Sequence, residues 1–279
     1  TEKGENQEVV GASIDLNKRG SQEYSIDPKL VKIGDKIGEG AFATVHKGRL
    51  KNKTVAVKLL SPKLMKNKDV VREFKAEIGI LCQLDHPNVI KCLGVCLQPP
   101  NYMVITEFMP RGTLFDVLHK GQIQFNWVLT KRIVLDIVRG MAYIHASNLL
   151  HRDLKSSNLL LDGNFNTKIG DFGLVHFMDP NNTSGTSLPI GHAGTWQYMA
   201  PEVIAHEPAT EKSDVYSFSI VLWEILSRKL PYLGMDPEQV ANNVLHQHLR
   251  PPIFPTFPQP LAVLMNACWH YDSNKRPSF

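Results

Sequence analysis

The chain has 279 residues, of which 43% are hydrophobic and 21% charged, the ordinary balance of a globular protein that buries a substantial core. Its formal net charge is only +4 and no basic block concentrates that excess, so we expect no nucleic-acid partner. No apolar run reaches the ~20 residues that a membrane helix needs, because the best run, around Val215 to Leu226, is broken by Glu224, so we expect no membrane segment here.

The first third of the chain has the pattern of a small sheet. Residues 1–29 are polar and weakly periodic, which predicts a mostly disordered tail or linker. Segment 69–84 has the apolar spacing of an amphipathic helix. Short segments rich in Val and Ile surround that helix and predict antiparallel strands. These segments are 31–38, 43–50, 53–60, 89–97 and 102–107.

The remainder of the chain has helical spacing. Residues 127–146 place their apolar side chains on one broad face, and residues 214–227 are apolar almost all round, which predicts a central buried helix. Clusters of Pro and Gly at 230–237 and 251–260 predict loops. This segregation of strands and helices predicts an α+β fold of two lobes, a small β-rich lobe with one helix and a larger helical lobe, with the active site between them.

The first motif is the glycine-rich segment Gly38-Glu-Gly40-Ala-Phe-Ala43-Thr-Val45, which precedes Lys58 in the third strand. A glycine hairpin lets backbone N–H groups approach phosphates because no Cβ intrudes. Lys58 lies among apolar neighbours, which favours an ammonium facing a cleft and needing a carboxylate partner. In the following helix Glu77 lies beside the apolar stripe, so we prefer it as that partner; Glu73, one turn earlier, is the alternative.

The second motif is the segment His151-Arg-Asp-Leu-Lys-Ser-Ser-Asn158. Asp153 can accept or orient a substrate hydroxyl, Lys155 can neutralise a γ-phosphate, and Asn158 can bind Mg²⁺. The alternative is a polar connecting loop, and His151 and Arg152, taken singly, would fit a role that only braces it.

Two further motifs follow along the chain. Asp171, within Gly170-Asp-Phe-Gly173, stands 18 residues after Asp153 and suits a hard cation that bridges phosphates. The segment from Gly194 to Glu202 ends in Ala-Pro-Glu, and we expect Glu202 to pair with Arg276 in the second lobe.

These four motifs, in this order and spacing, resemble the eukaryotic protein kinase superfamily from about Leu30 to Phe279. The resemblance implies ATP and Mg²⁺ as cofactors, protein substrates, and a bilobal kinase fold. It implies an N-lobe over 30–106, a hinge over 107–110 and a C-lobe over 111–279, which would end before the last helix that the family usually has.

The resemblance also implies roles for individual residues. Asp153, Lys155, Lys58 and Glu77 are implied to be catalytic, and Asn158 and Asp171 to hold Mg²⁺. Asp214 is implied to brace the catalytic loop. Ala43 departs from the family pattern, which has a third glycine there, and we expect at most an altered ATP affinity. The residues implied to contact the nucleotide, with Thr106 as gatekeeper, are Ile37, Gly38, Gly40, Val45, Ala56, Lys58, Thr106, Glu107, Met109, Leu160 and Asp171.

Lys155 and Thr195 fit the pattern of kinases that act on Ser and Thr. The loop Leu154 to Asn158, together with Trp223, resembles the tyrosine-kinase-like group, which includes the mixed-lineage and Raf-like kinases. We therefore expect a signalling Ser/Thr kinase. Dual specificity, a pseudokinase that acts as a scaffold, and a receptor-type kinase whose membrane span lies outside this sequence remain as alternatives.

Arg152, directly before Asp153, indicates regulation, because in the family this arginine receives a phosphate carried by the activation segment. An upstream kinase would supply that phosphate. The alternative is that the segment is only a flexible loop. The candidate acceptors are Thr183, Ser184, Thr186 and Ser187.

Four cysteines, Cys82, Cys92, Cys96 and Cys268, form no C-x-x-C pair, and three lie in apolar stretches. This pattern predicts buried free thiols in a reducing compartment rather than a metal site or a disulfide. We therefore expect a cytoplasmic location.

Overall fold

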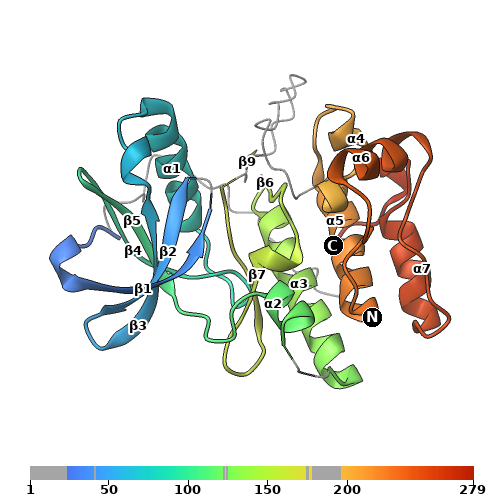
Figure 1. The fold of residues 1–279 in the computed structure, drawn as a ribbon, viewed down its shortest axis with the longest axis horizontal. Coiled ribbons are helices and arrows are strands. Elements are labelled where there is room, and N and C mark those ends of the chain that lie inside the picture. Colours follow the sequence, from blue (N-terminus) through green and yellow to red (C-terminus); the bar gives the residue numbers. More distant parts are fainter. Residues whose placement is uncertain (1–23, 41, 122, 124, 174–175, 178–195) are drawn as a thin grey trace, which may run out of the picture.

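The computed structural model describes residues 24–40, 42–121, 123, 125–173, 176–177 and 196–279. Figure 1 shows strands β1–β5 and helix α1 at one end of the molecule and helices α3–α7 at the other. This is the α+β bilobal arrangement that the sequence predicts. Among the described residues, no helix combines the length and apolarity needed to cross a membrane.

The N-lobe is a five-stranded antiparallel sheet in the order β1-β2-β3-β5-β4. One helix, α1, spans Lys68–Leu81 and begins where the side chain of Asn67 accepts hydrogen bonds from the N–H groups of Asp69 and Val70. The strands are β1 (Val31–Glu39), β2 (Ala43–Leu50), β3 (Lys53–Leu60), β4 (Cys92–Gln98) and β5 (Asn101–Glu107).

The C-lobe is built around α5, which spans Glu211–Ser227 and is buried over most of its length, as its apolar pattern predicts. Two short antiparallel pairs, β6 with β9 and β7 with β8, lie between α3 and α4 in sequence. Their bounds are β6 (Leu149–Leu150), β7 (Leu159–Leu161), β8 (Thr167–Ile169) and β9 (His176–Phe177). The other helices are α2 (Leu114–His119), α3 (Trp127–Ala146), α4 (Pro201–Ile204), α6 (Pro237–His246) and α7 (Gln259–Cys268).

The structure corrects the expected disorder of the N-terminal tail at its end. Residues 1–23 lie outside the described part, but Tyr24 and Ile26 are fixed on β4. The N–H of Ile26 donates to the carbonyl of Val95 at 2.9 Å, and the N–H of Val95 donates to the carbonyl of Tyr24 at 2.7 Å. Gly94 makes this docking feasible, because a Cβ there would stand 1.9 Å from the Ile26 side chain.

Two predicted boundaries also differ. The helix predicted to reach residue 84 ends at Leu81, because Gln83 and Leu84 form tighter three-residue turns. The strand predicted to begin at residue 89 begins at Cys92. Residues 89 and 90 are buried and pair instead with Ile169 of β8, which ties the segment after α1 to the C-lobe.

Candidate active site

One face of the N-lobe sheet gathers several of the predicted nucleotide contacts. Val45 and Lys58 are partners between β2 and β3, and Ala56 and Thr106 are partners between β3 and β5. Because side chains alternate along a strand, Ala56 and Lys58 share a face opposite to Val57, which is fully buried in a separate core cluster. The four side chains therefore line the same face of the sheet.

The glycine-rich hairpin connects β1 to β2 above that face. The N–H of Gly40 donates to the carbonyl of Ala43 at 2.8 Å, and Ala43 is buried opposite Leu60, so its methyl group is accommodated by the chain's own packing. A Cβ at Gly38 or Gly40 would stand 3.6 to 3.7 Å from its nearest neighbour, an ordinary contact. The described packing therefore does not itself require glycine at either position. Ile37, the residue before Gly38, is 51% exposed.

The segment after β5 leads into the C-lobe. The carboxylate of Glu107 accepts from the Lys168 ammonium at 2.7 Å and from the N–H of Lys91 at 2.9 Å, so this side chain links the lobes. Met109 is buried in the main core. Leu160 of β7 is half-buried and packs against that core.

Lys58 contacts two carboxylates, one from α1 and one from the segment after β8. Its Nζ lies 2.6 Å from Glu77 Oε1 and 3.2 Å from Asp171 Oδ1. Burial alone would lower the pKa of Lys58, but the two carboxylates outweigh it and raise that pKa above its ordinary value. Burial raises the pKa of Glu77. Burial acts in the same direction on Asp171, but the Lys58 charge prevails and lowers its pKa. Glu73, the alternative partner, is exposed.

Replacing Glu77 with Gln is expected to weaken catalysis, because Lys58 loses a charged partner while the shape of the side chain is kept. The matched change Glu73→Gln alters an exposed glutamate of the same helix and should leave activity within about twofold, the range of a surface substitution. Steady-state phosphate transfer by the two variants compares them directly. Equal activities would show that the Lys58–Glu77 contact does not support catalysis.

The catalytic-loop motif brings three of its polar side chains together. Asp153 Oδ2 lies 2.8 Å from Lys155 Nζ and accepts from Asn158 Nδ2 at 2.9 Å. The other carboxylate oxygen of Asp153, Oδ1, is buried and has no hydrogen-bond partner among the described residues. A buried acceptor without a donor costs free energy, so it marks a place where a ligand group fits.

His151 joins the catalytic loop to the segment that carries Asp171. Its Nε2 donates to the carbonyl of Gly170 at 3.1 Å, and its Nδ1 accepts from the N–H of Asp153 at 3.3 Å. This pattern defines a neutral imidazole with the proton on Nε2. The ring also packs edge-on against Phe172, which is 1% exposed. Asp171 has a φ of 56°, and these neighbours hold it in that left-handed conformation.

Asp214, on α5, supports the loop from below. It is 1% exposed, and it accepts from the N–H of His151 at 2.9 Å and from the N–H of Arg152 at 2.8 Å. His145 Nε2 lies 2.9 Å from the same carboxylate. Arg152 has a φ of 64°. The two backbone hydrogen bonds to Asp214 therefore form a clamp that holds a strained residue immediately before Asp153. The four predicted phosphate acceptors, Thr183, Ser184, Thr186 and Ser187, lie outside the described residues.

A family model described as protein tyrosine and serine/threonine kinase matches residues 31–279. This chain belongs to the protein kinase family. The fold and the arrangement around Lys58, Asp153 and Asp171 agree with that membership.

Curated relatives resemble the kinase over nearly its whole length. Serine/threonine-protein kinase STY46 of Arabidopsis thaliana is 38% identical over 100% of this chain and 47% of its own length. STY17 of the same plant, also a serine/threonine-protein kinase, is 36% identical over 98% of this chain and 47% of its own. Probable serine/threonine-protein kinase drkB of Dictyostelium discoideum is 40% identical over 91% of this chain and 36% of its own. The chain thus spans less than half the length of these relatives.

The predicted pair between Glu202 and Arg276 is present in the kinase. Arg276 donates to both carboxylate oxygens of Glu202, at 2.7 and 2.8 Å, and its side chain is fully buried. Its remaining hydrogen bonds go to the carbonyls of Lys212, His270 and Tyr271. The guanidinium therefore fastens α4 to α5 and to the C-terminal segment.

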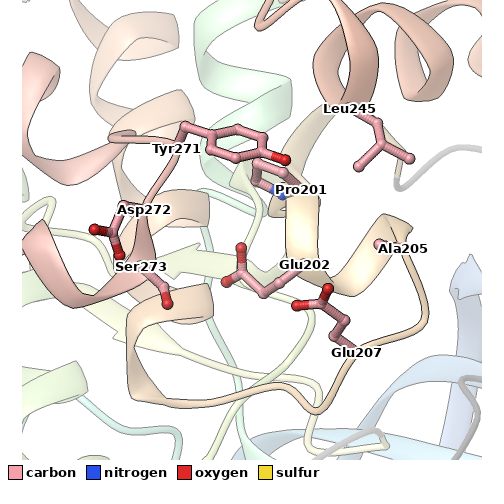
Figure 2. A pocket seen from close by; sticks show the side chains of 8 residues that line it. All are labelled: Pro201, Glu202, Ala205, Glu207, Leu245, Tyr271, Asp272 and Ser273. Carbon is pink, nitrogen blue, oxygen red and sulfur yellow. The ribbon is translucent and has the colours of Figure 1, made fainter.

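A pocket of about 290 Å³ opens beside α4. Figure 2 shows Tyr271 and Asp272 of the C-terminal segment on one side of it and Glu207 on the other. Its lining contains none of the predicted catalytic, nucleotide-binding or metal-binding residues. The pocket is therefore separate from the candidate active site.

Sequence reasoning missed Glu224, a residue that supports the catalytic loop of the kinase. It is fully buried on α5 and accepts from Ser156 of the catalytic loop at 2.8 Å and from the Tyr198 hydroxyl at 2.9 Å. His119 Nε2 of α2 lies 2.7 Å from the same carboxylate. The sequence did offer a signal for this role, because Glu224 is the single charged residue in the run from Val215 to Leu226.

Proposed function

We propose that this kinase domain transfers the γ-phosphoryl group of Mg-ATP to Ser or Thr hydroxyls of protein substrates. The observation that carries the proposal is the Asp153 carboxylate, with Oδ2 held by Lys155 and Asn158 and with Oδ1 buried and unmatched among the described residues. The relatives STY46, STY17 and drkB carry the name serine/threonine-protein kinase, in the last case as a probable one, which supports the same function.

The residues present fit a bound nucleotide. Ala56 and Leu160 come from opposite lobes, which suits an adenine ring between them, and the backbones of Glu107 and Met109 would read its edge next to Thr106. The Glu107 side chain is engaged by Lys168, which leaves only main-chain groups for that purpose.

The hairpin and Lys58 would hold the phosphates. Gly38 and Gly40 are not demanded by the described packing, so a closely approaching ligand accounts for the missing side chains. Ile37 and Val45 would cover the nucleotide from above. The Lys58 ammonium, kept charged by Glu77 and Asp171, would contact the α- and β-phosphates.

The metal-binding proposal concerns Asn158 and Asp171. Among the described residues, no group of three His, Cys, Asp or Glu side chains is placed to hold a metal ion. One carboxylate and one amide nevertheless fit Mg²⁺, which takes most of its oxygen ligands from phosphates and water. When bound, Mg²⁺ would neutralise charge on the transferring phosphoryl group.

Asp153 and Lys155 would act at the point of transfer. Oδ1 of Asp153 can accept a hydrogen bond from the substrate hydroxyl, orient its oxygen and take its proton as the phosphoryl group is transferred. Lys155, held by Oδ2, would offset the charge of the γ-phosphate. The presence of all these groups favours catalysis over a scaffold role, and Lys155 favours Ser and Thr over Tyr.

Regulation by phosphorylation is part of the same proposal. Asp214 fixes the backbone of Arg152, which directly precedes Asp153 in the catalytic loop. A phosphate on the segment between Asp171 and Glu202, added by an upstream kinase, would bind the Arg152 guanidinium and order the segment. Full activity in a variant with Thr183, Ser184, Thr186 and Ser187 all replaced by Ala would contradict this mechanism.

Phosphoamino-acid identification tests the main proposal. The purified chain is incubated with labelled ATP, Mg²⁺ and mixed protein substrates, beside a Lys58→Met variant. We expect label on Ser and Thr that is lost in the variant. Label on Tyr as well would establish dual specificity, and no label from folded protein, even after treatment with an upstream kinase, would establish the scaffold alternative.

A further inference from the structure

Two of the four cysteines face each other across the junction of α1 and β4. Cys82 follows the last residue of α1, and Cys92 is the first residue of β4. Their sulfur atoms lie 2.9 Å apart, and both residues are free thiols that are at most 5% exposed. A disulfide has a sulfur–sulfur bond of about 2.05 Å. Only a small movement therefore separates this pair from a covalent bond.

The other two cysteines have no such arrangement. Cys96 is buried in a separate core cluster, with Val55, Val57 and Met103, whereas Cys82 and Cys92 belong to the main core. Cys268 ends α7 in the C-lobe. The chain therefore provides its own controls, since Cys96 lies on the same strand as Cys92 and is buried to a similar degree.

We propose that Cys82 and Cys92 are a redox modification site, at which a peroxide such as H₂O₂ converts the two thiols into a reversible intramolecular disulfide. Neither residue belongs to the proposed phosphate-transfer machinery. The modification is thus a property of the kinase beyond its proposed reaction.

The two sulfurs share one hydrogen bond, in which either thiol can be the donor. When Cys82 donates, this bond lowers the pKa of Cys92 and, together with burial, raises the pKa of Cys82, so Cys92 is the readier nucleophile of the two. Its sulfur attacks one oxygen of H₂O₂, the O–O bond breaks, and Cys92 sulfenic acid and one water form. The Cys82 sulfur then attacks the Cys92 sulfur, the S–O bond breaks, and a second water leaves with the Cys82 proton.

Residues 24–26 dock on β4, the strand that begins with Cys92. Burial, and then the two thiols, raise the pKa of the Tyr24 hydroxyl. Tyr24 is only half-buried, and two backbone hydrogen bonds between 24–26 and Val95 hold the segment. Local opening of this segment would admit a molecule as small as H₂O₂.

The consequence concerns α1, which carries Glu77 five residues before Cys82. The thiols are close in the same structure in which Lys58 and Glu77 are 2.6 Å apart. The disulfide would therefore fasten the end of α1 in this ion-paired position. That effect on catalysis rests on the proposed function, whereas formation of the disulfide does not.

Peptide mapping of the wild-type chain tests the proposal. The protein is treated with H₂O₂, its free thiols are alkylated, and it is digested with trypsin without reduction. Cleavage after Lys75, Lys91 and Arg111 places Cys82 in peptide 76–91 and Cys92, with Cys96, in peptide 92–111. We expect these two peptides to appear joined, lighter by two hydrogen atoms than their sum, and to separate after reduction with dithiothreitol.

Two variants complete the assignment. Cys96→Ser should still give the joined peptides, whereas Cys82→Ser should give none and should leave a sulfenic acid on Cys92 that dimedone traps. Loss of the joined product in Cys96→Ser would assign the bond to Cys96 and overturn the proposal. Alkylation of Cys82 and Cys92 to the same extent with and without peroxide would also overturn it. Phosphate transfer measured before oxidation tests the proposed function separately.

Discussion

An Asp153→Asn variant is expected to fold normally and to transfer phosphate about 10²- to 10⁴-fold more slowly than the wild type, the usual contribution of a general base. The amide keeps the shape of the carboxylate but cannot take the proton of the substrate hydroxyl. It also loses the ion pair with Lys155 at 2.8 Å. The measurement is kcat with a saturating protein substrate, beside the KM for ATP, which we expect to change little.

The control for this prediction is Asp85→Asn, which removes a carboxylate that is 83% exposed and forms an ion pair with Lys91. Its kcat should match the wild type. Circular dichroism should show that both variants are folded. A folded Asp153→Asn variant with wild-type kcat would exclude Asp153 as the base and would remove the central support for the proposed reaction.

An Arg276→Ala variant is expected to lower the free energy of unfolding by about 3–5 kcal/mol, the cost of leaving one partner of a buried ion pair alone. Glu202 would keep the hydrogen bond from Ser213 but lose both bonds from the guanidinium, and the carbonyls of Lys212, His270 and Tyr271 would each lose a donor. Urea unfolding followed by fluorescence measures the change. Arg276→Lys should recover only part of it, because an ammonium cannot bind both carboxylate oxygens in the same plane.

The matched control is Arg72→Ala, which removes an ion pair whose two side chains are 76% and 71% exposed. This change should alter the free energy of unfolding by less than about 0.5 kcal/mol.

The pH dependence of stability offers a second test of the pair between Glu202 and Arg276. Burial alone would raise the pKa of Glu202, but Arg276 holds it below its ordinary value. The pair therefore contributes its full stabilisation at a pH above the ordinary glutamate pKa. This contribution to the free energy of unfolding is lost as the pH falls through the lowered pKa of Glu202. Equal acid sensitivity of wild type and Arg276→Ala would contradict the assignment.

The fold could be predicted where local pattern and burial agree. Strands β2 and β3 occupy the predicted ranges because their side chains alternate and their turns carry Gly or Lys-Asn-Lys. The start of β4 could not be found in this way. Val89 and Ile90 continue the apolar run of the strand, but the other lobe buries them, and periodicity does not distinguish one apolar environment from another.

The candidate site could likewise be predicted only where a local sequence pattern determines the contact. The contact between Lys58 and Glu77 followed from an apolar stripe that fixes which way the helix faces. The role of Glu224 could not be predicted in this way. Its partners, His119, Ser156 and Tyr198, come from separate parts of the chain that meet only in the tertiary fold. A charge inside an apolar helix signals a buried network, although its spacing does not name the partners.

The clamp at Asp214 should slow amide hydrogen exchange in the catalytic loop. The amides of His151 and Arg152 belong to an irregular loop, where amide hydrogens usually exchange quickly with solvent. Here both are bound to a carboxylate that is 1% exposed and belongs to the most deeply buried helix of the C-lobe. Their deuterium uptake should therefore be as slow as that of α5 itself, so that these loop amides open only when the whole lobe unfolds.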